Sequence, residues 1–167
     1  MEILEQFRAN TGETLGELSR KSPVVVLFVR HLGCTFCREA LADLAKHRPG
    51  IVAQGMSLAI VHMSTDDQAR ALAAQYKLDD VPRVSDPEQR LYAAFGLTRG
   101  KVLNVVGPQV WLRGLAAVIK HGIGIPQGDV LQMPGAFVLH NNEIVRAFRH
   151  TTSADLPDFE GLTCTLK

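Results

Sequence analysis

Apolar residues form two kinds of pattern that alternate along the chain. Residues 24–29 (Val-Val-Val-Leu-Phe-Val) are an unbroken, mostly β-branched run that follows a proline, which is typical of a strand buried on both faces. From residue 35 to residue 47 the apolar positions instead recur at helical spacing, and the pair Pro49-Gly50 is expected to end that helix. Residues 58–63 repeat the strand pattern, so the sequence predicts strands and helices in alternation.

Polar residues mark the ends of further elements. Residues 65–68 (Thr-Asp-Asp-Gln) have the sequence of a helix capping box. Asp86 places a capping carboxylate before a proline, which predicts a helix that starts there and ends at Gly96. A short helix over residues 2–8 and a short strand at Val84 complete the first half of the chain.

The C-terminal part of the chain predicts a β-hairpin. Residues 136–140 and 143–149 are strand candidates joined by a tight asparagine turn. Residues 98–133 before them are interpreted as an insertion that contains one amphipathic helix around Trp111. Strands that alternate with helices imply a central sheet, parallel at first, with helices on both faces, and the hairpin adds antiparallel strands. The sequence therefore predicts a single α/β domain over residues 1–167.

Composition and charge exclude several classes of protein. The 167 residues are 46% hydrophobic and 21% charged, which is close to the globular average and excludes wholesale disorder. The longest aliphatic and aromatic run is residues 24–29, whereas a membrane-spanning helix needs about 20 residues. A net charge of +1 gives no electrostatic footprint for nucleic acid or anionic lipid. Three cysteines and an acidic start without a long apolar stretch predict a reducing, cytoplasmic compartment.

Two of the cysteines carry the chemistry that the sequence suggests. Cys34 and Cys37 lie where the first predicted strand gives way to a helix, so Cys34 is expected near the helix N-cap, where free amides and the helix dipole stabilise a thiolate. His31 and Arg38 can add positive charge nearby. The spacing allows a reversible disulfide, and such a pair beside a strand–helix–strand unit indicates redox chemistry. Cys164 is expected to stay free, as an incidental or structural cysteine.

Other interpretations stand beside this one. The cysteine pair could consist of ordinary small apolar residues, or it could supply two ligands of a zinc site. The six histidines include no closely spaced pair to complete four ligands, which disfavours zinc. His150, at the end of a predicted strand, is interpreted as a surface residue rather than a general base. Trp111 is expected to pack in the core, and the glycines of residues 122–128 to form a loop rather than a dinucleotide-binding motif.

Four blocks of the sequence resemble one known family. They are the approach to the first central strand (residues 14–28), the cysteine turn (34–39), a strand, Asp-Pro and helix segment (84–97), and a strand that faces the cysteine turn (132–139). In this order they resemble the peroxiredoxin-like branch of the alkyl hydroperoxide reductase/thiol-specific antioxidant (AhpC/TSA) family, whose members have a thioredoxin-like fold. The resemblance implies that fold for most of residues 14–150.

The cysteine turn also departs from the family pattern. A standard peroxiredoxin has a Pro-x₃-Thr-x₂-Cys motif, in which Arg30 here replaces the proline, Cys34 replaces the threonine and Cys37 takes the peroxidatic position. Pro134 stands where the family has an arginine that stabilises charge on the peroxide oxygens, so a slower peroxide reaction is expected. Pro134 also resembles the cis-proline that faces the cysteine pair of a thioredoxin, which predicts a cis Met133–Pro134 bond opposite the two sulfurs.

The sequence therefore predicts a thiol-dependent oxidoreductase that cycles Cys34 and Cys37 between dithiol and disulfide, without a cofactor. With a small hydroperoxide as substrate, the resemblance implies attack by Cys37 and resolution by Cys34. With a protein disulfide, the motif implies attack by Cys34 and resolution by Cys37. A thioredoxin or glutathione system is the expected reductant, and a homodimer is one of the open oligomeric states. The alternative is a non-catalytic thioredoxin-like binding module or redox sensor.

Overall fold

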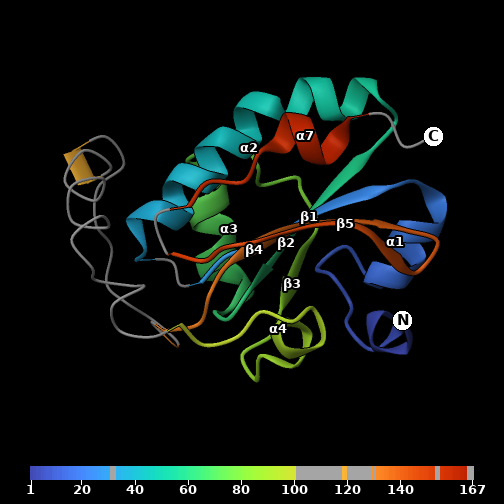
Figure 1. Ribbon diagram of the computed structural model, residues 1–167, viewed down its shortest axis with the longest axis horizontal. Helices are drawn as coiled ribbons and strands as arrows, with labels where there is room; N and C mark the ends of the chain where they lie inside the picture. Colours follow the sequence, from blue (N-terminus) through green and yellow to red (C-terminus); the bar gives the residue numbers. More distant parts are fainter. Residues whose placement is uncertain (31–32, 101–117, 120–128, 130, 153–154, 165–167) are drawn as a thin grey trace.

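The computed structural model describes residues 1–30, 33–100, 118–119, 129, 131–152 and 155–164. Within them, a five-stranded sheet of order β3-β2-β1-β4-β5 forms the middle of the molecule (Figure 1). The central strand β1 (Val24–Phe28) pairs in parallel with β2 (Ser57–His62) and antiparallel with β4 (Gly135–His140). β3 (Arg83–Ser85) extends the parallel side, and β5 (Glu143–Arg149) extends the antiparallel side. The predicted mixed sheet and closing hairpin are confirmed.

Helices cover both faces of the sheet, as the sequence predicted. Figure 1 shows α2 and α7 side by side on one face and α4 beyond the other. The face that holds the cysteines is covered by α2 (Thr35–Ala53), α3 (Asp66–Ala74) and α7 (Phe159–Thr163). The opposite face is covered by α1 (Leu15–Lys21), α4 (Arg90–Ala94) and the 3-10 helix η1 (Glu2–Glu5). Because every residue of β1 is buried between these two cores, its sequence shows no polar alternation.

Helix α2 is longer than the sequence predicted. It continues through Pro49 and ends at Ala53, although a proline inside a helix removes a hydrogen bond and disfavours the preceding turn. The turn after the proline buries Ile51, which is only 2% exposed and packs in the core with the sheet. This burial offsets the cost of the proline, so the expected stop at Pro49-Gly50 was wrong.

The starts of three helices also differ from the sequence prediction. The side chain of Thr65 makes no capping hydrogen bond at the start of α3, and the neighbouring Asp66 carboxylate binds Arg83 instead. Asp86 accepts hydrogen bonds from two backbone amides at the start of α4, but the helix begins only at Arg90. Helix α1 was not predicted, although Thr14 forms a complete capping box with the third residue of that helix.

The two ends of the predicted insertion meet at its base. Arg99 forms a bridge with Gln132, and the amide of Gly100 donates to the carbonyl of Leu131. The expected helix around Trp111 and the expected loop at residues 122–128 lie outside the described residues. Among the described helices, none has the length and the apolar composition that crossing a membrane requires.

Candidate active site

The two cysteines lie at the point where the chain leaves β1 and enters α2. Cys34 is the N-cap residue of α2, and its Sγ accepts a hydrogen bond from the backbone amide of Cys37 at 3.4 Å. Both side chains are buried, at 4% and 3% exposure, and both are free thiols. The predicted N-cap position of Cys34 is confirmed, and it aims helix amides at the sulfur.

Arg30, a residue directly beyond β1, reaches both sulfurs. Its Nη2 donates to the Sγ of Cys34 at 2.9 Å, and its backbone amide donates to the Sγ of Cys37 at 3.2 Å. The residue is 5% exposed, and a buried guanidinium requires anionic or strongly polar partners. From the sequence, Arg30 was interpreted only as a replacement for a proline. Its place, a charged residue between a fully apolar strand and a cysteine turn, was the signal for a role at the sulfurs.

The two sulfurs have opposite protonation tendencies. The hydrogen bond from the Cys37 thiol and the charge and hydrogen bond of Arg30 lower the pKa of Cys34 well below the usual thiol value. Burial raises the pKa of Cys37 well above it, and the neighbouring Cys34 sulfur raises it further. These opposite shifts favour a pair in which Cys34 is the thiolate and accepts a hydrogen bond from a protonated Cys37. The thiolate is the reactive form of cysteine.

Pro134 lies opposite the cysteine turn, as predicted, but its peptide bond is not cis. It lines a small cavity together with Cys37. The Met133–Pro134 bond is trans, so the prediction of a cis bond was wrong. The amide of Met133 donates to the carbonyl of Thr98 just before β4. Trans is the favoured form of an X–Pro bond, and the comparison with the thioredoxin cis-proline loses its support.

His150 is part of the same cavity, and its interpretation as a surface residue was wrong. The register of β5 against β4 places it beside Pro134, whose carbonyl accepts a hydrogen bond from the His150 amide at 3.4 Å. The side chain is 8% exposed and lines the cavity with Cys37. Burial lowers the pKa of His150 to about 4, so the imidazole is neutral at pH 7. Its position depends on strand pairing, which no local sequence signal reports.

Two further residues, Arg38 and His31, were predicted to support the site with positive charge. Arg38 is in the first turn of α2, where its amide donates to the carbonyl of Cys34 at 3.1 Å. Its positive charge also acts on the hydroxyl of Tyr76. His31 lies outside the described residues. The positively charged group that contacts the Cys34 sulfur is the guanidinium of Arg30.

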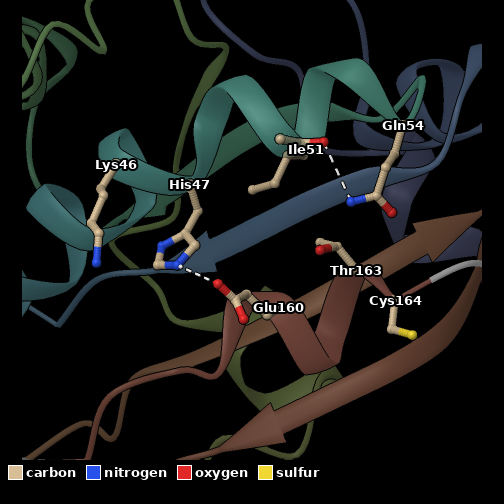
Figure 2. Close-up of a pocket in the computed structure, with 8 residues that line it drawn as sticks. Lys46, His47, Ile51, Gln54, Glu160, Thr163 and Cys164 are labelled. Atoms are coloured by element: carbon tan, nitrogen blue, oxygen red, sulfur yellow. Dashed lines mark hydrogen bonds and ion pairs between the residues drawn. The ribbon is translucent and has the colours of Figure 1, made fainter.

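Cys164 is remote from the pair. It follows α7, is exposed, and lines a groove between α2 and α7, in which Glu160 faces His47 (Figure 2). The groove also contains Ile51, near the far end of α2 from Cys34. At 1.5 Å per helical residue, these two ends are about 25 Å apart. Cys164 therefore cannot reach the Cys34 sulfur within one chain while the fold is intact. Over the described residues, no group of three or more histidine, cysteine or acidic side chains could hold a metal ion.

A mixed sheet with a cysteine pair at the start of the helix that follows its central strand defines a thiol protein of the thioredoxin fold. The comparison with known families makes this assignment specific. Residues 5–148 match the family model described as "AhpC/TSA family", and the chain belongs to that family.

Known relatives agree with the family assignment, and a solved structure shares the fold. The chain is 28% identical over 136 residues to Peroxiredoxin-like 2C of Mus musculus, which covers 75% of this chain and 60% of that protein. It is 27% identical over 164 residues to prostamide/prostaglandin F synthase of Danio rerio, with 93% and 81% covered. The alkyl-peroxide-reducing bacterioferritin comigratory protein of Xanthomonas campestris superimposes with a TM-score of 0.60 at 17% identity, over 86% of this chain and 78% of that one. The chain thus spans about three fifths of the mouse relative.

Proposed function

We propose that this chain is a peroxiredoxin-type thiol oxidoreductase in which Cys34 and Cys37 cycle between a dithiol and a disulfide. One observation carries the proposal: the Cys34 sulfur receives hydrogen bonds from the Arg30 guanidinium, at 2.9 Å, and from a helix amide, at 3.4 Å. These donors stabilise a thiolate, which is the nucleophile of thiol peroxidases and of disulfide exchange. Membership of the AhpC/TSA family supports the same class of chemistry.

The first step is attack by Cys34. With a hydroperoxide, the thiolate sulfur bonds to one peroxide oxygen, the O–O bond breaks, and the leaving alkoxide or hydroxide takes a proton from solvent. The sulfur is oxidised to a sulfenic acid. Arg30 is placed to stabilise the negative charge, a task that the family gives to an arginine where this chain has Pro134. The burial of both sulfurs favours a small hydroperoxide over the disulfide of a folded protein.

The second step is resolution by Cys37. Its sulfur attacks the Cys34 sulfenic acid, the S–S bond forms, the S–O bond breaks, and the oxygen leaves as water. An external thiol reductant of the thioredoxin or glutathione type then donates two electrons and restores the dithiol. In this scheme Cys34 attacks in both modes. For the peroxide mode, the roles are the reverse of those that the family pattern implies.

Single-cysteine variants test the proposal directly. Reduced protein receives one equivalent of hydrogen peroxide, the reaction is quenched with a thiol-trapping reagent, and mass spectrometry reports the state of each cysteine. We expect Cys37→Ser to accumulate sulfenic acid at Cys34, and Cys34→Ser to be nearly inert. The matched control Cys164→Ser should form the Cys34–Cys37 disulfide as the wild type does.

Three outcomes would contradict parts of the proposal. A fast reaction in Cys34→Ser with none in Cys37→Ser would reverse the two roles. Loss of Cys164 together with one member of the pair would overturn the choice of partners. One stoichiometric oxidation without sustained turnover, in the presence of a thioredoxin system, would identify a redox sensor instead of an enzyme.

A further inference from the structure

His150 is a buried polar side chain whose polarity the fold itself does not use. By hydrogen-bond geometry, neither of its ring nitrogens has a partner within the described part of the chain, although the ring is only 8% exposed and the backbone of Thr152 lies close enough to act on it. Desolvating an imidazole without a hydrogen bond is unfavourable, and phenylalanine would fill a similar volume at no such cost. A histidine in this position therefore suggests a task that a purely apolar ring could not perform.

The task follows from the neighbour across the cavity. The cavity is lined by His150, Cys37, Pro134 and apolar side chains, and its space of about 10 Å³ is close to what one water molecule requires. Cys37 must lose a proton to attack Cys34, yet burial and the neighbouring sulfur favour its protonated form. Tyr92 also lies near Cys37, but its hydroxyl donates to the Val29 carbonyl and its pKa is raised by burial, so it keeps its proton.

We propose that His150 accepts the proton of Cys37 as the Cys37 sulfur attacks oxidised Cys34. The transfer runs through one water molecule in the cavity, and the inference rests on the proposed function. The S–S bond forms as the S–H bond of Cys37 breaks, the proton moves to a ring nitrogen, and hydroxide leaves Cys34. The proton then returns to that hydroxide as water, so imidazole is regenerated and no net proton remains.

The surroundings of the ring suit a transient acceptor. Arg30 and Asp155 are the charged groups that act on His150, with opposite effects; the Thr152 backbone also acts on it, and Cys37 lines the same cavity. Because the imidazole is neutral at pH 7, it has a free nitrogen lone pair. Because burial disfavours the protonated ring, the ring holds the proton only until the departing hydroxide takes it.

The test separates the two steps of the cycle. His150→Phe keeps a ring of similar shape, and His150→Gln keeps polarity but cannot accept a proton. In rapid-quench experiments we expect Cys34 oxidation within about twofold of wild type and disulfide formation slower by roughly 100-fold or more in both variants, the usual range for general acid–base catalysis. His140→Gln, a histidine at the other end of β4, is the matched control and should resolve at the wild-type rate.

The pH dependence gives a readout that a packing role would not change. In both His150 variants the rate of disulfide formation should rise about tenfold per pH unit between pH 6 and 8, because only Cys37 that has already ionised reacts. In the wild type the rate should be nearly flat over this range and fall below about pH 5, as the imidazole takes up a proton. A tenfold rise per unit in the wild type would overturn the inference even if neither variant folded.

The two proposals fail in different ways. If wild-type Cys34 does not react with peroxide or forms no disulfide with Cys37, the proposed function fails. If the wild type completes both steps and the folded His150 variants form the disulfide at the wild-type rate, only the role of His150 fails. Circular dichroism and thermal melting confirm the fold of each variant.

Discussion

Two buried arginines, one on β3 and one just after β1, show how the same side chain can serve stability in one place and chemistry in another. Arg83, 3% exposed, binds the carboxylate of Asp66 at 3.0 Å and donates to the backbone carbonyl of Asp79 at 2.6 Å. Arg30, 5% exposed, binds the Cys34 sulfur instead. A carboxylate keeps its charge across the neutral pH range, whereas a thiolate loses its charge when it is oxidised or protonated. Arg83 therefore has a fixed partner, and Arg30 has one that the reaction changes.

Each arginine also has a buried histidine within electrostatic reach. His62 is fully buried near Arg83, and His150 is 8% exposed near Arg30. Burial lowers the pKa of both to about 4, and among the described residues only a nearby backbone group, at Ser64 or Thr152, acts on either ring as a hydrogen-bonding group. The difference is the neighbour: His150 shares a cavity with Cys37, a sulfur that must change its protonation state. The comparison suggests that the partner, rather than the basic residue, decides between a structural and a chemical role.

The largest expected effect is on stability at Arg83. Arg83→Met should lower the free energy of unfolding by about 3 kcal/mol, because it breaks a buried ion pair and leaves carbonyls without a donor. This value is at the lower end of the usual range, since Asp66 is 44% exposed and keeps part of its hydration. Arg30→Met should cost clearly less, because Cys34 can take up a proton and leave no buried charge. Urea unfolding of the reduced proteins at pH 7 measures both, and equal losses would break the comparison.

Acid is expected to lower the stability of the fold through His62, the buried histidine near Arg83. His62 is uncharged in the folded chain down to about pH 4, whereas in the unfolded chain it binds a proton below about pH 6.5. The unfolded state therefore binds more protons between these values, and stability falls as the pH falls from about 6.5 to 4. The charged groups that act on His62 are Asp66 and Arg83.

Replacing His62 removes its share of this acid sensitivity. His62→Phe should reduce the loss of unfolding free energy between pH 6.5 and 4 by about 2–3 kcal/mol. Urea unfolding at several pH values measures this loss, and His140→Gln, at the end of β4, is the control. An unchanged pH slope in His62→Phe would mean that this imidazole is already protonated in the folded chain.

The sequence predicted the parts of the fold that are encoded locally. The apolar run at β1 and the hairpin of β4 and β5 were found because burial on both faces and a tight turn leave direct patterns. Helix boundaries were less predictable, because tertiary burial decided them. Ile51 in the core carries α2 past Pro49, and the same capping motif forms its hydrogen bonds at Thr14 but not at Thr65.

The candidate site divides in the same way. Cys34 and Cys37 are close in sequence, so their spacing and their place at the helix start predicted a redox pair. His150 reaches the pair only through the pairing of β5 with β4 and of β4 with β1. The role of Arg30 was missed for a different reason. Its place between an apolar strand and the cysteine turn was a signal, but the sequence alone does not show that this side chain turns inward to the Cys34 sulfur.

Reactivity of Cys34 is expected to depend on one arginine and not on the other. Arg30→Met should slow alkylation of Cys34 by iodoacetamide at pH 7 by roughly ten- to a hundredfold, because the sulfur loses a charged donor and spends less time as a thiolate. Arg83→Met, if folded, should alkylate at the wild-type rate. Both variants are prepared on a Cys164→Ser background, so that the exposed thiol does not contribute. Equal slowing in the two variants would show that the thiolate depends on general stability.

The smallest expected effect is on the reduction potential of the cysteine pair. It tests whether Arg30, unlike Arg83, has a partner whose charge changes during the reaction. A thiolate bound to Arg30 stabilises the reduced state, and oxidation removes the negative charge that the guanidinium contacts. Both effects make the wild-type disulfide more oxidising, so Arg30→Met should shift the potential by about 30 mV to more negative values, equivalent to ~1.4 kcal/mol. Equilibration of the Cys34–Cys37 pair with glutathione at fixed pH measures this shift, and Arg83→Met should leave the potential unchanged. A positive shift in Arg30→Met would mean that the arginine stabilises the disulfide, and the argument that its partner changes with the reaction would be wrong.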